Sequence, residues 1–230
     1  MPVTACVFDA YGTLFDVAAA ARRAAAEPGH AALAQVWAPL AETWRLKQLQ
    51  YSWLRAVTGA HTDFWTVTGE GLDFALEAHG LDGDAALRER LLALYWELDA
   101  YPEVPEMLLA LRRAGHKTAI LSNGAPEMLK GAIESAGIGE LLDAVLSVED
   151  VGVFKPDARV YRMVEASLDV PPAQVLFGSS NGWDAAAATG FGFRTVWVNR
   201  ASDPVDRLPW RPAYILPDLT GIPTIAGEEI

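Results

Sequence analysis

A short apolar stretch that ends in a carboxylate, Val3 to Asp9, constrains the fold more than any other part of the chain. A mostly apolar run of this length is typical of a parallel strand that is buried on both faces. Gly12 follows, and glycine lets the backbone turn sharply because it accepts a positive φ. Ligands of an open parallel sheet bind outside the carboxyl ends of its strands, where Asp9 could act as a nucleophile. These residues alone equally allow Asp9 to cap the turn and Gly12 to serve only the turn.

Composition narrows the class of protein and its partners. With 230 residues, of which 51% are hydrophobic, the chain can bury a large core, and disorder is disfavoured. A net charge of −12 opposes binding to nucleic acid or to an anionic membrane, and two arginines break the alanine-rich stretch 17–26 that could otherwise resemble a span. The single cysteine, Cys6, excludes an intramolecular disulfide. Together with an N-terminus that lacks a signal-like segment, it favours a cytoplasmic protein.

The order of expected elements changes twice along the chain. Residues 16–100 show apolar spacing typical of successive helices and no convincing strand. From Pro102 onward helices and strands alternate, with strands expected at 117–121, 144–148, 174–178 and 194–198. The tail, with five prolines between residues 204 and 223, is expected to be irregular.

This order predicts an α/β fold, a doubly wound, Rossmann-like parallel sheet core with an inserted helical cap domain. We expect the core domain to comprise residues 1–15 and 101–230, and the cap domain to comprise residues 16–100. A site built from strand ends would then lie between the two.

Polar residues follow the expected strands or begin the expected helices at four places. They are Asp9 with Thr13, Ser122 with Asn123, Lys155, and Ser179 with Asn181 and Asp184. A parallel sheet would bring these clusters to one edge. Each also has a simpler interpretation: Ser122 and Asn123 are helix-capping types, Lys155 could be a solvated charge, and Asp184 could favour the start of its helix.

The segment Phe8-Asp9-Ala10-Tyr11-Gly12-Thr13-Leu14 resembles the first motif of the haloacid dehalogenase superfamily, whose members attack with that first aspartate. Phosphatases of the superfamily carry a second carboxylate two residues later. This chain has Tyr11 there, and an aromatic residue at that position resembles the type II branch, the L-2-haloacid dehalogenases. The match continues in chain order along nearly the whole sequence.

The resemblance implies a role for each matching residue. The matching catalytic positions are Asp9, Thr13, Arg45, Ser122, Lys155, Tyr161, Ser179, Asn181 and Asp184. Asp9 would displace the halide to form an ester, Thr13 and Ser122 would orient Asp9 and the substrate carboxylate, and Lys155 would hold Asp9 as an anion. Asp184, with Ser179 and Asn181, would activate the water that cleaves the ester; Tyr161 matches an active-site position without a clear role.

The substrate-binding positions implied by the resemblance are Tyr11, Arg45, Leu49, Phe64, Ser122, Asn123 and Trp183. Arg45 would accept the departing halide, because a fixed guanidinium stabilises a growing negative charge, and Asn123 could add a side-chain amide. Without the resemblance, Arg45 could equally be a solvated charge on a helix.

Superfamily phosphatases hold magnesium with acids of the first and last motifs, whereas this chain has Tyr11 and Ser179 at those positions. The four histidines also show no ligand spacing. We therefore expect no metal and no cofactor. The expected reaction is metal-independent hydrolysis of short-chain (S)-2-haloacids to (R)-2-hydroxyacids through an aspartyl ester.

Two alternatives remain at this point. A phosphatase of the same fold, acting on a small phosphomonoester, is disfavoured by Tyr11 and Ser179. A catalytically silent binding protein is opposed by the presence of Asp9, Lys155 and Asp184. The expected partners are a small 2-haloacid and water, and a homodimer is expected because the resembled family often dimerises.

Overall fold

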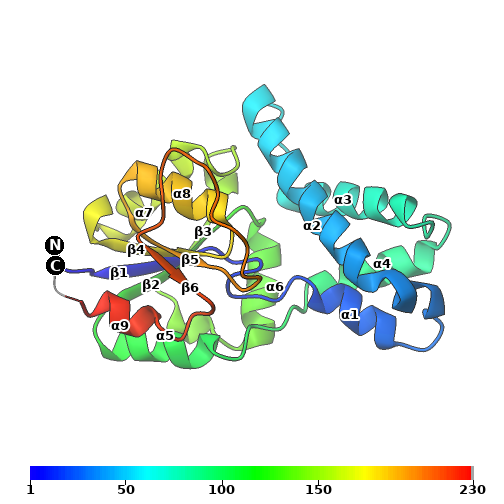
Figure 1. The fold of residues 1–230 in the computed structure, drawn as a ribbon, viewed down its shortest axis with the longest axis horizontal. Helices are drawn as coiled ribbons and strands as arrows, with labels where there is room; N and C mark the ends of the chain where they lie inside the picture. Colours follow the sequence, from blue (N-terminus) through cyan, green and yellow to red (C-terminus); the bar gives the residue numbers. More distant parts are fainter. Residues whose placement is uncertain (229–230) are drawn as a thin grey trace.

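The computed structural model describes residues 1–228 and consists of a parallel sheet covered by helices and a block of helices beside it (Figure 1). The strands are β1 (Ala5–Phe8), β2 (Lys117–Ser122), β3 (Ala144–Ser147), β4 (Val175–Ser179), β5 (Arg194–Val198) and β6 (Tyr214–Leu216). The α-helices are α1 (Ala19–Ala26), α2 (Ala31–Thr58), α3 (Phe64–Ala78), α4 (Ala85–Tyr95), α5 (Val104–Arg113), α6 (Pro126–Ala136), α7 (Ala158–Leu168), α8 (Gly182–Phe191) and α9 (Ile222–Ala226). Short 3₁₀ turns are η1 (Gly139–Leu141), η2 (Val148–Asp150) and η3 (Pro172–Gln174).

The sheet has the strand order β3-β2-β1-β4-β5-β6, and all its neighbouring strands are parallel. The first apolar run forms β1, which is fully buried in the middle of the sheet. The order of strands reverses between β1 and β4, so a topological switch point lies beside the carboxyl end of β1. Open parallel sheets bind ligands at such a point. The predicted α/β fold is therefore confirmed.

Helices cover both faces of the sheet: α7 and α8 lie on one face, and α5, α6 and α9 on the other (Figure 1). Helix α7 illustrates why the sequence folds this way. Its buried residues Val160, Tyr161, Val164 and Leu168 form one stripe at helical spacing, as predicted. This apolar stripe faces the sheet, and the polar residues of α7 face away from it.

Helices α1 to α4 form the block beside the sheet, and α2, the longest, extends obliquely from the block toward the side of α8 (Figure 1). Residues typical of helix ends lie between α2 and α3. Gly59, which has a φ of 69°, follows the last residue of α2, and Asp63 precedes the first residue of α3 and accepts a side-chain hydrogen bond from the N–H of Thr66. In this described part of the chain, no helix has both the length and the apolar character that a membrane span needs.

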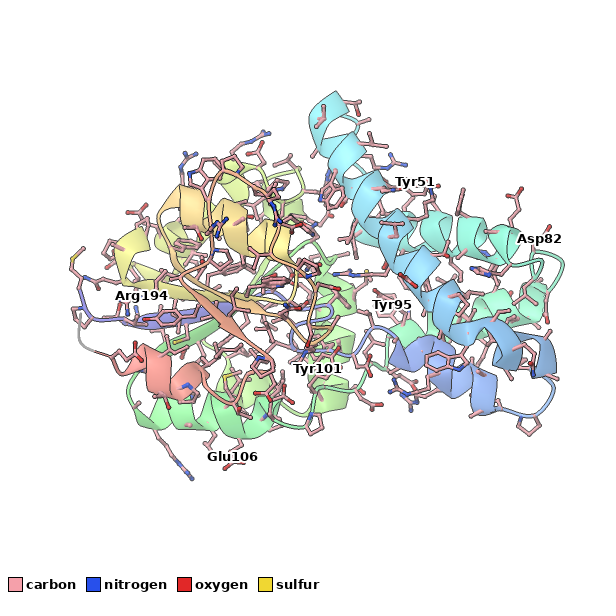
Figure 2. The ribbon with its side chains drawn as sticks, in the orientation of Figure 1. Tyr51, Asp82, Tyr95, Tyr101, Glu106 and Arg194 are labelled. Atoms are coloured by element: carbon pink, nitrogen blue, oxygen red, sulfur yellow. The ribbon has the colours of Figure 1, made fainter. Side chains whose placement is uncertain are left out.

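The two chain segments that join the helical block to the sheet run side by side. Phe15 and Ala100 form an antiparallel bridge, and the N–H of Tyr101 donates to the carbonyl oxygen of Leu14 over 2.9 Å. Tyr101 lies at this junction (Figure 2). The predicted division into a core of residues 1–15 and 101–230 and a cap of residues 16–100 stays a prediction about domains.

The prediction of an irregular tail is confirmed for residues 199–213, which form no helix or strand, but it is wrong for the residues that follow. Residues Tyr214–Leu216 form β6, which pairs in parallel with β5 at the edge of the sheet, and α9 follows. The prolines do not interrupt these elements: Pro212 and Pro217 stand outside β6, and Pro223 lies in the first turn of α9. An edge strand and a first helical turn both tolerate proline because few backbone N–H groups are needed there.

Candidate active site

Both the sheet and the helical block contribute residues to a small cavity at the carboxyl ends of β1, β2 and β4. Its volume is about 10 Å³, close to that of a single water molecule. The lining residues are Asp9, Tyr11, Arg45, Leu49, Phe64, Ser122, Asn123, Lys155, Asn181 and Trp183. Every residue predicted to bind substrate lines this cavity, together with three further residues predicted to be catalytic.

Asp9 lies directly after β1 and is held by three side-chain donors. The Oγ1 of Thr13 donates to its Oδ2 over 3.0 Å, and the Nδ2 of Asn181 donates to the same oxygen over 3.2 Å. The Nζ of Lys155 donates to its Oδ1 over 3.2 Å. These bonds fix the plane of a carboxylate that is only 6% exposed yet faces the cavity. Such a group is oriented for attack on a bound molecule.

Lys155 joins Asp9 to a second buried carboxylate. Its Nζ also donates to the Oδ2 of Asp184 over 2.9 Å, and the hydroxyl of Tyr161 donates to the Oδ1 of Asp184 over 2.7 Å. Lys155 is 1% exposed and Asp184 is 0% exposed, so neither is a solvated surface charge. One ammonium group thus compensates two carboxylates in the interior.

Burial and the neighbouring charges shift the pKa values of Asp184, Lys155 and Tyr161. Burial, together with the nearby charge of Asp9, raises the pKa of Asp184 above its ordinary value, and Lys155 and Tyr161 only partly oppose it. Burial alone would lower the pKa of Lys155, but Asp184 and Asp9 raise it. Burial also keeps the pKa of Tyr161 well above 10, so its hydroxyl remains a donor to Asp184. A carboxylate with a raised pKa is suited to accept a proton.

Arg45 approaches the cavity from α2. Its Nη2 donates to the backbone oxygen of Tyr11 over 3.0 Å and to the Oδ1 of Asn181 over 3.3 Å. Asn181 therefore contacts Arg45 with its oxygen and Asp9 with its nitrogen. This bond geometry orients the guanidinium along one wall of the cavity, so the structure contradicts the interpretation of Arg45 as a freely solvated charge.

Gly12 permits the close approach of these groups. Its φ is +87°, and a Cβ there would lie 3.0 Å from the Oγ of Ser180 and 3.8 Å from the Nη2 of Arg45. Both the backbone conformation and the available space thus favour glycine.

Aromatic side chains form the apolar wall. Tyr11 stacks on Tyr95 of α4 with ring centroids 5.6 Å apart, and it also packs against Phe64 at 6.1 Å. Tyr95 lies on the side of the helical block that faces the sheet (Figure 2). Trp183 meets Trp53 of α2 edge to face at 5.3 Å. The wall is thus shared between residues of the core and residues of the helical block.

Four predicted catalytic residues lie behind the cavity instead of lining it: Thr13, Tyr161, Ser179 and Asp184. The Oγ of Ser179 accepts a hydrogen bond from the N–H of Asn181 over 3.2 Å. Ser122 lines the cavity, but its Oγ accepts from the N–H of Gly124 over 3.0 Å and, within residues 1–228, makes no hydrogen bond to Asp9. Its hydroxyl proton is therefore available to a bound molecule. The Oδ1 of Asn123 accepts from the N–H of Lys155 over 2.9 Å.

Sequence reasoning missed several residues that support the site. Ser180 contacts Thr13 twice, because its N–H donates to the Thr13 Oγ1 over 2.8 Å and the two hydroxyls lie 3.1 Å apart. The Nε2 of Gln48 donates to the hydroxyl of Tyr95 over 3.1 Å and so braces the stack on Tyr11. The sequence did contain a sign of this contact, because Gln48 is a polar residue among apolar residues at helical spacing.

Acidic and metal-ligating residues are otherwise dispersed. Over residues 1–228, no three His, Cys, Asp or Glu side chains come together as a group that could hold a metal ion. At the site itself, the space between the two carboxylates is filled by the ammonium group of Lys155.

Comparison with known proteins adds a family and several relatives. Residues 3–192 match the family model described as haloacid dehalogenase-like hydrolase. The protein named (S)-2-haloacid dehalogenase 1 from Pseudomonas sp. (strain CBS-3) is 48% identical over 203 residues, which cover 88% of this chain and 87% of that protein.

Solved structures resemble this chain over nearly its whole length. A structure described as a dehalogenase has 40% sequence identity and a TM-score of 0.92, and the match covers 99% of this chain and 98% of the other. The L-2-haloacid dehalogenase from Xanthobacter autotrophicus, solved with chloropropionic acid covalently bound, has 38% identity and a TM-score of 0.85, with 97% and 98% covered.

Proposed function

Because this chain belongs to the haloacid dehalogenase-like hydrolase family, we propose that it hydrolyses short-chain (S)-2-haloacids to (R)-2-hydroxyacids. The observation that carries the proposal is the oriented carboxylate of Asp9, which three donors hold against a cavity that also contains Arg45. The relatives named (S)-2-haloacid dehalogenase support the same reaction, as does the related structure with covalently bound chloropropionic acid.

In the first step, a carboxylate oxygen of Asp9 forms a bond to C2 of the substrate while the carbon–halogen bond breaks. The halide leaves with the bonding electron pair, and an ester of Asp9 results. The guanidinium of Arg45 receives the halide, and its two bonds to Tyr11 and Asn181 keep it oriented for that purpose. The hydroxyl of Ser122 and the amide of Asn123 face the same cavity and would bind the substrate carboxylate or the halide.

In the second step, water attacks the carboxyl carbon of the Asp9 ester, and the C2–O bond stays intact. Asp184 accepts the proton of that water; its raised pKa supports this role, and each of its oxygens keeps a lone pair beyond its present hydrogen bond. Asn181 and Ser179 would position the water. The acyl C–O bond of the ester then breaks, and the hydroxyacid leaves with the proton that Asp184 accepted. The second proton of the water is released, which restores Asp9 as a carboxylate.

Metal independence is part of the proposal. Magnesium at such a site would require carboxylate ligands, but the carboxylates of Asp9 and Asp184 are already bridged by the Nζ of Lys155. The ammonium group of Lys155 thus supplies positive charge between these carboxylates, and this supports a reaction without a metal. We further infer a cytoplasmic homodimer, since the sequence composition and the family favour that state.

The test is halide release from (S)-2-chloropropionate beside phosphate release from p-nitrophenyl phosphate, each with EDTA and with added magnesium. We expect halide release that EDTA does not change, and no phosphate release. Chiral chromatography should identify the product as (R)-lactate, because displacement at C2 inverts that centre and ester hydrolysis does not touch it. Retained or racemic product, or a strict magnesium requirement, would contradict the proposal.

A further inference from the structure

Arg200, two residues beyond the end of β5, reaches the loop that carries the nucleophile. Its Nη2 donates to the backbone oxygen of Thr13 over 3.0 Å and lies 2.7 Å from the Oε1 of Glu103. Its guanidinium carbon lies 3.5 Å from the ring centre of Tyr101. The side chain is 21% exposed, so this is a largely buried, ordered contact and not a surface ion pair.

Thr13 is the residue through which this contact can reach the chemistry. Its Oγ1 donates to the Oδ2 of Asp9 over 3.0 Å and accepts from the N–H of Ser180 over 2.8 Å. Its backbone oxygen is held by Arg200. The next carbonyl along the loop, that of Leu14, accepts from the N–H of Tyr101 over 2.9 Å. The N–H groups of Thr13 and Leu14 both donate to the backbone oxygen of Ala10, over 3.2 and 2.8 Å. Thr13 is therefore held at its hydroxyl by Ser180, at its N–H by Ala10 and at its carbonyl oxygen by Arg200.

We propose that Arg200 is a positioning residue for the nucleophile: it fixes the peptide group of Thr13 and thereby the hydroxyl that orients Asp9. This inference rests on the proposed function. Arg200 does not line the cavity, so it acts through Thr13 and not on the substrate. The planar guanidinium suits this task because it can stack on Tyr101 while one nitrogen points to Thr13 and Glu103.

The two chemical steps respond differently to a misplaced Thr13. Formation of the ester requires an oxygen of Asp9 to point at C2, so it depends directly on the orientation that Thr13 imposes. Hydrolysis of the ester depends on the water, on Asp184 and on Asn181. Among the residues that the structure describes, neither Asp184 nor Asn181 forms a hydrogen bond or an ion pair with Arg200. Loss of Arg200 should therefore slow ester formation and leave ester hydrolysis nearly unchanged.

The experiment measures both steps in single turnovers with (S)-2-chloropropionate: halide release for the first, and disappearance of the protein adduct in intact-protein mass spectrometry for the second. In Arg200→Met, halide release should slow at least about tenfold, because small misplacements of reacting groups cost that much or more. Thermal unfolding of each variant establishes that the protein is folded. If Arg200→Met does not fold, Arg200→Lys replaces it, since it keeps a charge for Glu103 but loses the planar stack.

Two matched controls separate this role from general stability. Arg112→Met removes a more exposed arginine, 36% accessible, that pairs with Asp143 over 2.9 Å near the opposite end of the sheet, and halide release should stay within about threefold. Glu103→Gln removes the ion pair of Arg200 but leaves its bond to Thr13, and it should also stay within about threefold.

A double-mutant cycle tests the route through Thr13. In a Thr13→Ala background there is no hydroxyl left to position, so adding Arg200→Met should slow halide release by less than about threefold further. Four results would each overturn the proposal. They are additive losses of halide-release rate in the double mutant, equal slowing of both chemical steps, unchanged halide release in the folded Arg200 variant, and an equally large loss of halide-release rate in Glu103→Gln. Halide release by the wild type tests the proposed function itself, so the two failures are distinguishable. Without wild-type halide release both ideas fall, whereas normal halide release in Arg200→Met removes only the positioning role.

Discussion

Replacing Lys155 by methionine would leave two carboxylates buried without their cation. The Nζ lies 3.2 Å from the Oδ1 of Asp9 and 2.9 Å from the Oδ2 of Asp184, in surroundings where the lysine side chain is 1% exposed. Methionine keeps much of the apolar stem, so the change is chiefly the loss of the charge. Removing one partner of a buried ion pair costs about 3–5 kcal/mol of unfolding free energy. For a chain of this length, the midpoint of thermal unfolding should fall by about 6–20 °C.

The size of this loss should depend on pH, and the sign follows from Asp184. Burial and the charge of Asp9 already raise its pKa in the wild type, and removal of Lys155 takes away the main opposing influence. Between the unfolded pKa of about 4 and the raised folded value, the folded state binds a proton that the unfolded state does not. Lowering the pH through that window stabilises the folded variant. The pKa of Lys155 is itself raised, so this lysine stays charged in the wild type from pH 5 to pH 8. The destabilisation by Lys155→Met should therefore be larger at pH 8 than at pH 5.

Urea unfolding followed by tryptophan fluorescence at pH 5 and pH 8 measures both effects. Lys130→Met is the matched control, because this exposed lysine of α6 should change the unfolding free energy by less than about 0.5 kcal/mol. Adding Asp184→Asn to Lys155→Met should restore part of the stability at pH 8, since one uncompensated charge is removed. A loss below about 1 kcal/mol for Lys155→Met, or a loss that is the same at both pH values, would refute the electrostatic reasoning.

Two further predictions concern catalysis. Arg45→Ala should lower kcat by about 10²–10³-fold with little change in KM, because the negative charge that Arg45 receives develops in the transition state. Arg45→Lys should recover little of the lost kcat, because lysine lacks the planar fork of the guanidinium. Steady-state halide release checks this, and an effect of tenfold or less would place Arg45 outside the reaction. Asp184→Asn should slow ester hydrolysis more than ester formation. Mass spectrometry should then detect an adduct on Asp9 with the mass of the substrate minus its halide. Halide release without any adduct would contradict the assignment of Asp184 as base.

The fold could be predicted because its signals are local. The buried strands are short apolar runs, and β5 was predicted with the bounds that the structure has. The tail could not be predicted in the same way. Strand β6 is three residues long, and its middle residue, Ile215, is exposed. It exists because β5 offers a free edge. That edge is a property of the assembled sheet, and no pattern in residues 204–223 contains it.

The residues of the site likewise fall into those that a local sequence rule predicts and those that it does not. Residues such as Asp9, Ser122 and Ser179 stand at strand ends, and parallel topology alone predicts that they meet. Arg45 belongs to a helix of the inserted block, and no strand-end rule places it there; only the resemblance to a family did. Arg200 was not predicted at all. It stands two residues beyond β5, but it does not line the cavity, and its importance lies in its bond to a backbone oxygen, which a sequence does not display.

The two cations of the cavity, Lys155 and Arg45, differ in whether a carboxylate already neutralises their charge. This difference indicates where the halide binds. The charge of Lys155 is shared between two carboxylates at hydrogen-bonding distance, so an arriving anion gains little from it. Arg45 donates only to neutral oxygens, those of the Tyr11 backbone and the Asn181 amide. Over residues 1–228, none of its contacts within 4.0 Å is a carboxylate oxygen. Arg45 thus retains an uncompensated charge on the cavity wall. Esterification neutralises Asp9 at the moment when the halide appears, so the new anion meets a site that has just lost a negative charge and still holds a free positive one.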